Sequence, residues 1–316
     1  MKLNSFWFWA AVIALFGAAM TLFDILPVNQ FLYFAGYVVL QYVVLATAWN
    51  IMGGYMGYVN FGSAGFFALG AYTSVVMYNL FKAPLFVMIP VSGIVCGLLG
   101  LGMGYLTLRL RGVFFAIATL ALAIVLETLI TNWDYVGGAS GAYILRPRTI
   151  QPFGDYVEYL FFVMLLLAIF AVGVARWLER SRIGRGFAAI RDDELAAECT
   201  GVPTLRLKLL ATTISGFLMG IAGAPFPLYV SFVEPSSAFN LVYAVNAIAM
   251  PMIGGATTWV GPLIGALLLG SVQQVATVTI SSELNLLIVG VLLVFFVIAA
   301  PEGIVGLVRK WRRGGK

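Results

Sequence analysis

Residues 191–194 are four consecutive charged residues, Arg-Asp-Asp-Glu, in a chain of 316 residues of which only 10% are charged. Alanines follow them closely, and the stretch ends at Gly201 and Pro203. This pattern predicts a short helix with a charged face and an alanine-rich face, which stops at a glycine and a proline as helices commonly do. The chemistry available to such a helix is the binding of a protein partner at a membrane surface.

Residue types that support catalysis or metal binding are scarce. The chain has no histidine and two cysteines, Cys96 and Cys199, which we expect to be free thiols. Such a composition leaves no histidine for a nucleophilic triad and no set of zinc, haem or iron–sulfur ligands. No G-x-x-x-x-G-K-[ST] loop occurs to hold ATP phosphates. The sequence therefore predicts a protein that is not an enzyme and has no resident cofactor.

Two glycine-rich stretches contain polar side chains within apolar sequence. Residues 50–72 and 254–265 mix glycine with Asn, Ser, Thr and Pro, and they lie in the two halves of the chain. Broken helices have this composition, and their free backbone groups can line a solute path. The uncharged candidates for a translocation pathway are Asn50, Asn60, Ser63, Thr119 and Thr257. Each of them is also of a type that forms hydrogen bonds between packed helices.

The elements that must position these residues are membrane helices. Residues of the AVILMFWYC set make up 62% of the chain, whereas a soluble domain has about 45–50% apolar residues. Ten apolar segments are long enough, or nearly so, to cross a hydrocarbon core of about 30 Å. They are residues 6–26, 31–52, 57–81, 84–108, 113–132, 157–178, 209–232, 241–255, 259–280 and 284–308.

We predict an all-α polytopic membrane protein, a single transmembrane domain over residues 1–316 with about 8–10 membrane-spanning helices. Segment 57–81 is interrupted by glycines and segment 241–255 is short, so either could be a half-helix or a re-entrant element. Segment 6–26 also has features of a signal peptide, but its apolar stretch exceeds the usual length of about 7–15 residues. We expect it to be a retained helix.

The basic residues predict the orientation. With an even number of crossings and a cytoplasmic amino terminus, 15 of the 18 Lys and Arg residues lie inside. Basic residues resist translocation, so this asymmetry predicts that both termini are cytoplasmic. Residues 133–156 then form an external loop that could dock another protein, and residues 179–208 form a cytoplasmic loop.

Many of the 35 glycines are four residues apart, which places them on one face of a helix. Small residues at this spacing let helix backbones approach closely. The sequence therefore predicts close helix packing at these glycines. The pairs are Gly53 and Gly57, Gly93 and Gly97, Gly100 and Gly104, Gly216 and Gly220, and Gly261 and Gly265.

The stretch RGFAAIRDDELAAECTG at residues 185–201 resembles the coupling loop of ABC importer permeases. Its residue sequence is similar to that of the branched-chain amino-acid (LIV type) permeases, in the longer of their two permease subunits. Three more stretches carry the resemblance in the same order, namely residues 57–72, residues 111–122 with 132–141 following, and residues 254–270. Relatives often have His at the position of Ser63, which leaves the solute open.

The resemblance implies a permease domain that pairs with a second, related permease. It also implies two cytoplasmic ATPase subunits, a periplasmic solute-binding protein and a bacterial inner membrane, with no part for nucleic acid. The solute would be a branched-chain amino acid or a related small polar solute such as urea, an amide or an aromatic acid. The residues implied in ATPase coupling are Arg185, Arg191, Asp192, Asp193, Glu194, Ala197, Glu198 and Gly201.

The alternative is a secondary transporter or channel that no ATPase powers. Such a protein would place ion-coupling carboxylates within the membrane, where buried charge is costly and is usually retained for function. Glu127 is the one carboxylate that qualifies, and it lies about five residues from the outer end of its segment. Its side chain could therefore reach the interface or face the pathway.

Overall fold

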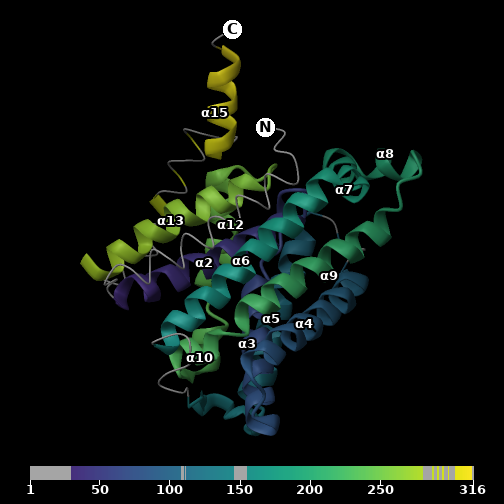
Figure 1. Cartoon of the computed structure of the whole chain (residues 1–316). Helices are drawn as coiled ribbons and strands as arrows, with labels where there is room; N and C mark the ends of the chain where they lie inside the picture. Colours follow the sequence, from purple (N-terminus) through teal and green to yellow (C-terminus); the bar gives the residue numbers. More distant parts are fainter. Residues whose placement is uncertain are drawn as a thin grey trace.

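The computed structural model describes residues 30–107, 110, 112–145, 155–279 and 303–314, with the isolated positions 287, 290, 291, 294 and 298. Helices account for most of these residues (Figure 1). The long helices are α2 (Gln30–Gly53), α3 (Ser63–Phe81), α4 (Leu85–Thr107), α5 (Val113–Thr131), α6 (Tyr156–Arg180), α9 (Thr204–Gly223), α12 (Leu241–Gly254) and α13 (Val260–Thr279). The short elements are η1 (Asp134–Val136), η2 (Gly138–Ser140), β1 (Ala142–Tyr143), α7 (Arg182–Asp192), α8 (Glu194–Cys199), α10 (Phe226–Val230), β2 (Phe232–Val233), α11 (Pro235–Ala238) and α15 (Gly303–Gly314).

Eight helical segments within the described residues are long and apolar enough to cross a membrane. This confirms the predicted all-α polytopic class. The predicted segment 6–26 and most of segment 284–308 lie outside the described residues. Of the two doubtful segments, the first forms a helix only from Ser63 onward, and the second is extended by α11 to a span of 20 residues from Pro235 to Gly254.

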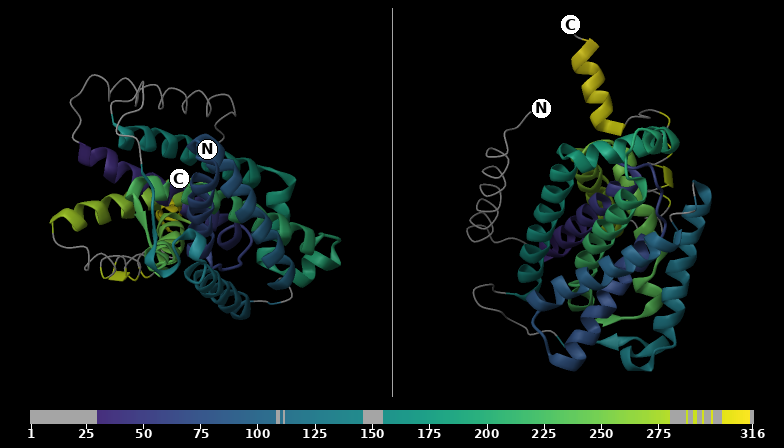
Figure 2. Two further views of the ribbon diagram at one scale, coloured as in Figure 1. Left: turned by 90° about the horizontal axis from the view of Figure 1, so that it is seen from below. Right: turned by 90° about the vertical axis from the view of Figure 1, so that its right-hand side faces the viewer.

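Helix α2 lies at the centre of the bundle and packs against α6, α9, α12 and α13 (Figures 1 and 2). Its second half is buried at every position from Gln41 to Met52. A helix that is apolar all round has no solvent-facing side, so it is stable only inside a bundle or a membrane. The end of α2 is therefore held on all sides, and residues that follow it are placed precisely.

Glycine faces make the closest helix contacts, as the spacing predicted. A Cβ atom added to Gly100 of α4 would lie 2.5 Å from the carbonyl oxygen of Thr212 in α9. In the reverse direction, a Cβ atom on Gly220 of α9 would lie 2.6 Å from the carbonyl oxygen of Ser92 in α4. Only glycine leaves room for backbones at this separation.

The predicted pairing of Gly53 with Gly57 is wrong. Helix α2 ends at Gly53, and Gly57 lies beyond it with a φ of +80°. This φ belongs to the left-handed region that glycine adopts without strain. Gly57 therefore serves a turn in the connection to α3, and the two glycines share no helix face.

The two ends of the bundle carry different elements. Helices α7, α8 and α15 lie at one end, and η1, η2 and the β1–β2 pair lie at the other (Figures 1 and 2). Strand β1, within the predicted external loop, pairs antiparallel with β2, with Ala142 opposite Val233. Residues 142–144 thus lie against the chain that follows α10, whereas residues 146–154 lie outside the described part. Residues 133–145 and the α7–α8 segment lie at opposite ends of the bundle (Figures 1 and 2).

Candidate functional site

The two glycine-rich stretches meet at the end of α2. The Asn50 side-chain nitrogen donates to the carbonyl oxygen of Thr258 at 3.5 Å. A Cβ atom on Gly54 would lie 2.1 Å from the carbonyl oxygen of Ala256, so the backbones are in close contact there. Residues separated by about 200 positions in the chain therefore form one junction, at the end of the bundle that carries α7. We call residues 50–62 and 254–261 the glycine junction.

Asn60, Ser63 and Thr119 lie together on the α3 side of this junction, and all three are buried. The Thr119 hydroxyl accepts from the backbone N–H of Phe61 at 3.0 Å and donates to the carbonyl of Ala116 at 2.8 Å. The Asn60 side-chain oxygen accepts from the N–H of Gly62 at 2.7 Å. These bonds fix the connection between α2 and α3 against α5, while the Ser63 hydroxyl has no hydrogen-bond partner among the described residues.

The other two pathway candidates lie apart from this group. Thr257 is exposed, and it is the adjacent residue, Thr258, that is buried and contacts Asn50. Glu127 is half-buried on α5, eight residues beyond Thr119, which corresponds to about 12 Å along the helix. The structure therefore brings four of the six candidates to the glycine junction and leaves Thr257 and Glu127 outside its interior.

Two charged residues at the end of α6 hold the second glycine-rich stretch, and sequence reasoning missed them. A Glu179 carboxylate oxygen accepts from the backbone N–H of Trp259 at 2.6 Å. The guanidinium carbon of Arg176 lies 5.4 Å from the centre of the Trp259 ring, in cation–π geometry. The available signal was their spacing of three, which puts both side chains on one face of the helix.

Sequence reasoning also missed a network of polar side chains that links α2, α12 and α13. Gln273 of α13 donates to the Asn246 side-chain oxygen at 2.9 Å, and Asn246 of α12 donates to the Tyr42 hydroxyl of α2 at 3.1 Å. Gln273 and Asn246 are each 1% exposed. Single amides inside apolar membrane-length segments were the signal for this network, because an amide in hydrocarbon needs partners.

The charged segment is two helices where the sequence predicted one. Asp193 has an extended backbone, ends α7, and accepts from the N–H of Ala196 with its side chain at 3.1 Å, which caps α8. Aspartate is among the preferred residues at a helix amino terminus, so the break follows from local chemistry. The predicted stop is confirmed, since Gly201 follows α8 with a φ of +83°.

The segment has an inner and an outer face. Phe187, Ile190 and Ala197 are buried and attach α7 and α8 to the bundle, and the Glu194 side chain is only 14% exposed. The outer face contains Leu195, which is 58% exposed, and the Asp192 side chain, which is 71% exposed. Of the other predicted residues, Arg185, Asp193, Glu198 and Gly201 are exposed, and Arg191 is exposed in part while its guanidinium reaches the backbone of Gly54.

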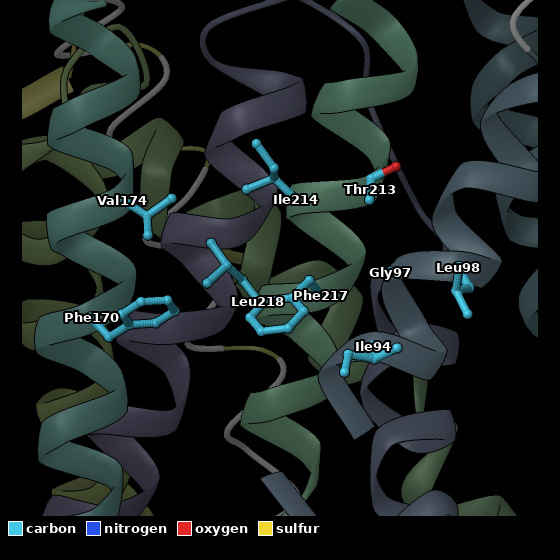
Figure 3. Close-up of a pocket in the computed structure, with 9 residues that line it drawn as sticks. All are labelled: Ile94, Gly97, Leu98, Phe170, Val174, Thr213, Ile214, Phe217 and Leu218. Atoms are coloured by element: carbon cyan, nitrogen blue, oxygen red, sulfur yellow. The ribbon is translucent and has the colours of Figure 1, made fainter. Parts of the chain in front are cut away.

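A groove of about 420 Å³ lies between α4, α6 and α9 and, unlike the glycine junction, is lined by apolar side chains (Figure 3). Its lining includes Ile94, Leu98, Phe170 and Phe217. The one hydroxyl in the lining, of Thr213, is bonded to the carbonyl oxygen of Leu209 at 2.7 Å. The lining is therefore almost entirely apolar, and the groove suits a charged or zwitterionic solute poorly.

Comparison with known proteins shows which sequences this chain resembles. Residues 31–297 match the family described as "Branched-chain amino acid transport system / permease component". The high-affinity branched-chain amino acid permease protein LivM of Escherichia coli K12 is 30% identical over 293 residues, which cover 85% of this chain and 68% of that protein. A probable LivH permease of Methanocaldococcus jannaschii is 22% identical over 80% of this chain and 84% of its own. No solved structure matches.

Proposed function

This chain belongs to the family of branched-chain amino acid transport permeases, and on that premise we propose that it forms one half of the solute pathway of a binding-protein-dependent ABC importer. The second half is a related permease. Two ATPase subunits bind on the cytoplasmic side, and a periplasmic protein delivers the solute. The assembly lies in the inner membrane of a bacterium, with both termini of this chain in the cytoplasm.

The observation that carries the proposal is the α7–α8 segment. Its inner face is anchored on the bundle through Phe187 and Ile190, and its outer face presents the charged side chain of Asp192 and the apolar side chain of Leu195. A helix pair that is fixed on one side and exposes a mixed surface on the other fits a groove of a protein partner. ATP-driven closure of the ATPase dimer moves this segment and, with it, the helices that meet at the glycine junction.

The buried polar groups favour an aliphatic amino acid as the solute. The glycine junction and the Gln273–Asn246–Tyr42 network supply hydroxyl and amide groups among apolar side chains. Such groups can pair with the two charges of a zwitterion while the surroundings accept its aliphatic side chain. Urea, short amides and aromatic acids are the competing solutes of related chemistry.

Purification of this chain from its native membrane tests the function. We expect it to bring with it two P-loop ATPase subunits and a second polytopic permease. After reconstitution into vesicles with the binding protein, labelled leucine uptake should require ATP and should be inhibited by isoleucine or valine more strongly than by urea. Uptake that an ion gradient drives in the absence of any ATPase would instead establish the secondary transporter.

Thiol labelling tests the orientation. In a variant that lacks Cys96 and Cys199, a cysteine introduced at Leu195 should react with an impermeant maleimide only from the cytoplasmic side. A cysteine introduced at Tyr143, which is 76% exposed at the opposite end, should react only from outside. The physical reason is the retention of basic residues on the cytoplasmic side. Reaction of both positions from one side would contradict the predicted topology, in which α6 crosses the membrane between them.

A further inference from the structure

Three side chains form a buried cluster beneath the α7–α8 segment. The Lys208 ammonium lies 2.5 Å from one Glu194 carboxylate oxygen, and the Tyr58 hydroxyl donates to the other. The ammonium also lies 4.6 Å from the centre of the Tyr58 ring. The side chains of Lys208 and Glu194 are 3% and 14% exposed. We call these residues the Lys208–Glu194–Tyr58 cluster.

Each member of the cluster comes from a different element. Glu194 is the first residue of α8, and Lys208 lies in the second turn of α9. Tyr58 belongs to the connection between α2 and α3, and its ring packs edge-on against Phe115 of α5 at 5.2 Å. The cluster therefore joins the proposed ATPase-binding segment to α9, to α5 and to the α2–α3 connection, which is part of the glycine junction.

A second contact from α7 reaches the same connection. An Arg191 guanidinium nitrogen donates to the carbonyl oxygen of Gly54 at 3.4 Å. A Cβ atom on Gly57 would lie 3.0 Å from the Cγ atom of Arg191, so the arginine stem packs directly on the backbone there. The α7–α8 segment thus touches the connection at Gly54, Gly57 and Tyr58. Three residues later, Phe61 is bonded to Thr119 of α5.

Burial distinguishes the cluster from the exposed charges around it. The exposed pair of Arg191 with Asp192 can break and re-form in water at little cost. Separation of Glu194 from Lys208 would leave two charges buried without their partners, which is strongly unfavourable. When α8 moves, the least costly response is that α9 and the α2–α3 connection move with it.

We propose that the Lys208–Glu194–Tyr58 cluster is the link that transmits ATPase movement from α8 to the glycine junction, with Lys208 and Tyr58 as positioning residues. This inference rests on the proposed function. It assigns Glu194 to the inside of the permease, where it holds the moving parts together, and leaves contact with the ATPase to the outer face. The link predicts that loss of the cluster separates ATP hydrolysis from transport while the ATPase stays bound.

The test uses the complete transporter in vesicles and compares Glu194→Gln, Lys208→Met and the double variant. Each single variant removes the opposite charge beside a charge that stays largely buried, so both should lower folded yield, whereas the double variant removes both charges and should recover it. All three should co-purify with the ATPase subunits and lower leucine uptake per ATP hydrolysed by about fivefold or more, a typical coupling factor. Lys208→Arg should retain coupling because it keeps the charge.

Arg206→Met is the matched control. Arg206 is exposed and lies two residues before Lys208, so the change removes one positive charge without touching the cluster. We expect it to keep both yield and coupling. A direct readout is a cysteine at Val59, which is 38% exposed beside Tyr58, in the variant without Cys96 and Cys199. Its labelling rate should change when vanadate and ATP trap the ATPase, and this change should disappear in the double variant.

Normal coupling and a normal Val59 labelling change in the folded double variant would overturn the link. Tyr58→Phe serves if the single variants fail to fold, because it removes only one hydroxyl. We expect it to lower coupling. Full coupling in both Tyr58→Phe and the double variant would count against the link. Failure of the unaltered chain to retain any ATPase would overturn the proposed function itself. The two failures are thus separated by whether the unaltered chain retains its ATPase subunits.

Discussion

Replacement of Gly265 by Leu is expected to reduce the yield of folded protein several-fold without preventing membrane insertion. A Cβ atom at this position would lie 1.8 Å from the carbonyl oxygen of Met250 in α12. A side chain cannot occupy that space unless α12 and α13 separate, and overpacking of a fixed core costs about 1–3 kcal/mol or more. Insertion depends on the hydrophobicity of the segment, which leucine increases. The measurement is the monodisperse fraction after detergent extraction, relative to total protein in the membrane.

Gly102→Leu provides the control for this effect. Gly102 lies on α4, and a Cβ atom there would meet no atom within 4 Å among the described residues. The same substitution should be tolerated, since leucine is more favourable than glycine inside a helix by up to about 1 kcal/mol. Equal yields for the Gly265 and Gly102 variants would show that α12 and α13 do not need to approach closely.

The spacing of glycines predicted such faces but could not predict their partners. A separation of four residues places Gly261 and Gly265 on one side of a helix, whatever that helix packs against. Their partner, α12 with the residue that follows it, is identified only by the fold. A Cβ atom on Gly265 would meet the carbonyl of Met250 in α12, and one on Gly261 would meet the carbonyl of Gly255, directly after α12, at 1.9 Å. Local periodicity therefore predicted the helices and their small-residue faces, while the pairing of faces depends on contacts between distant segments.

In the charged segment, too, the sequence predicted the helical structure but not the partners of single side chains. Helical periodicity placed Asp192 and Glu194 in one charged run, and it could not show that the Asp192 side chain is exposed while the Glu194 side chain lies against the bundle. The break at Asp193 starts a new helix at Glu194, whose side chain then lies against Lys208, 14 residues later, and Tyr58, 136 residues earlier. Contacts over such separations are fixed by tertiary packing, and a single sequence holds no direct record of them.

Asn246 and Gln273 were missed for a related reason. Each is a single amide within an apolar helix, and an amide in that setting is also common as a simple hydrogen bonder between helices. What distinguishes these two is that they meet each other and Tyr42 in the bundle interior. The composition of the helices predicted their burial, whereas only the packing of α2, α12 and α13 predicts the network.

The double change Asp192→Lys and Leu195→Asp is expected to abolish ATPase co-purification and leucine uptake while membrane expression stays normal. Both side chains are on the outer face of α7–α8 and lie outside the Lys208–Glu194–Tyr58 cluster. On a solvated loop the changes would cost about 0–1 kcal/mol. In a desolvated interface, reversed charge and a buried carboxylate cost about 2–5 kcal/mol, enough to dissociate the complex during purification.

This pair is a sharper test than reversal of Asp192 with Glu194, which would also break the internal bond to Lys208. The matched control makes the same two changes at the opposite end, Asp134→Lys with Leu145→Asp, where Leu145 is 83% exposed. That variant should keep its ATPase subunits. Quantitative blotting of the co-purified ATPase decides the outcome. A fully retained ATPase in the Asp192 and Leu195 variant would return α7–α8 to the status of a solvated loop.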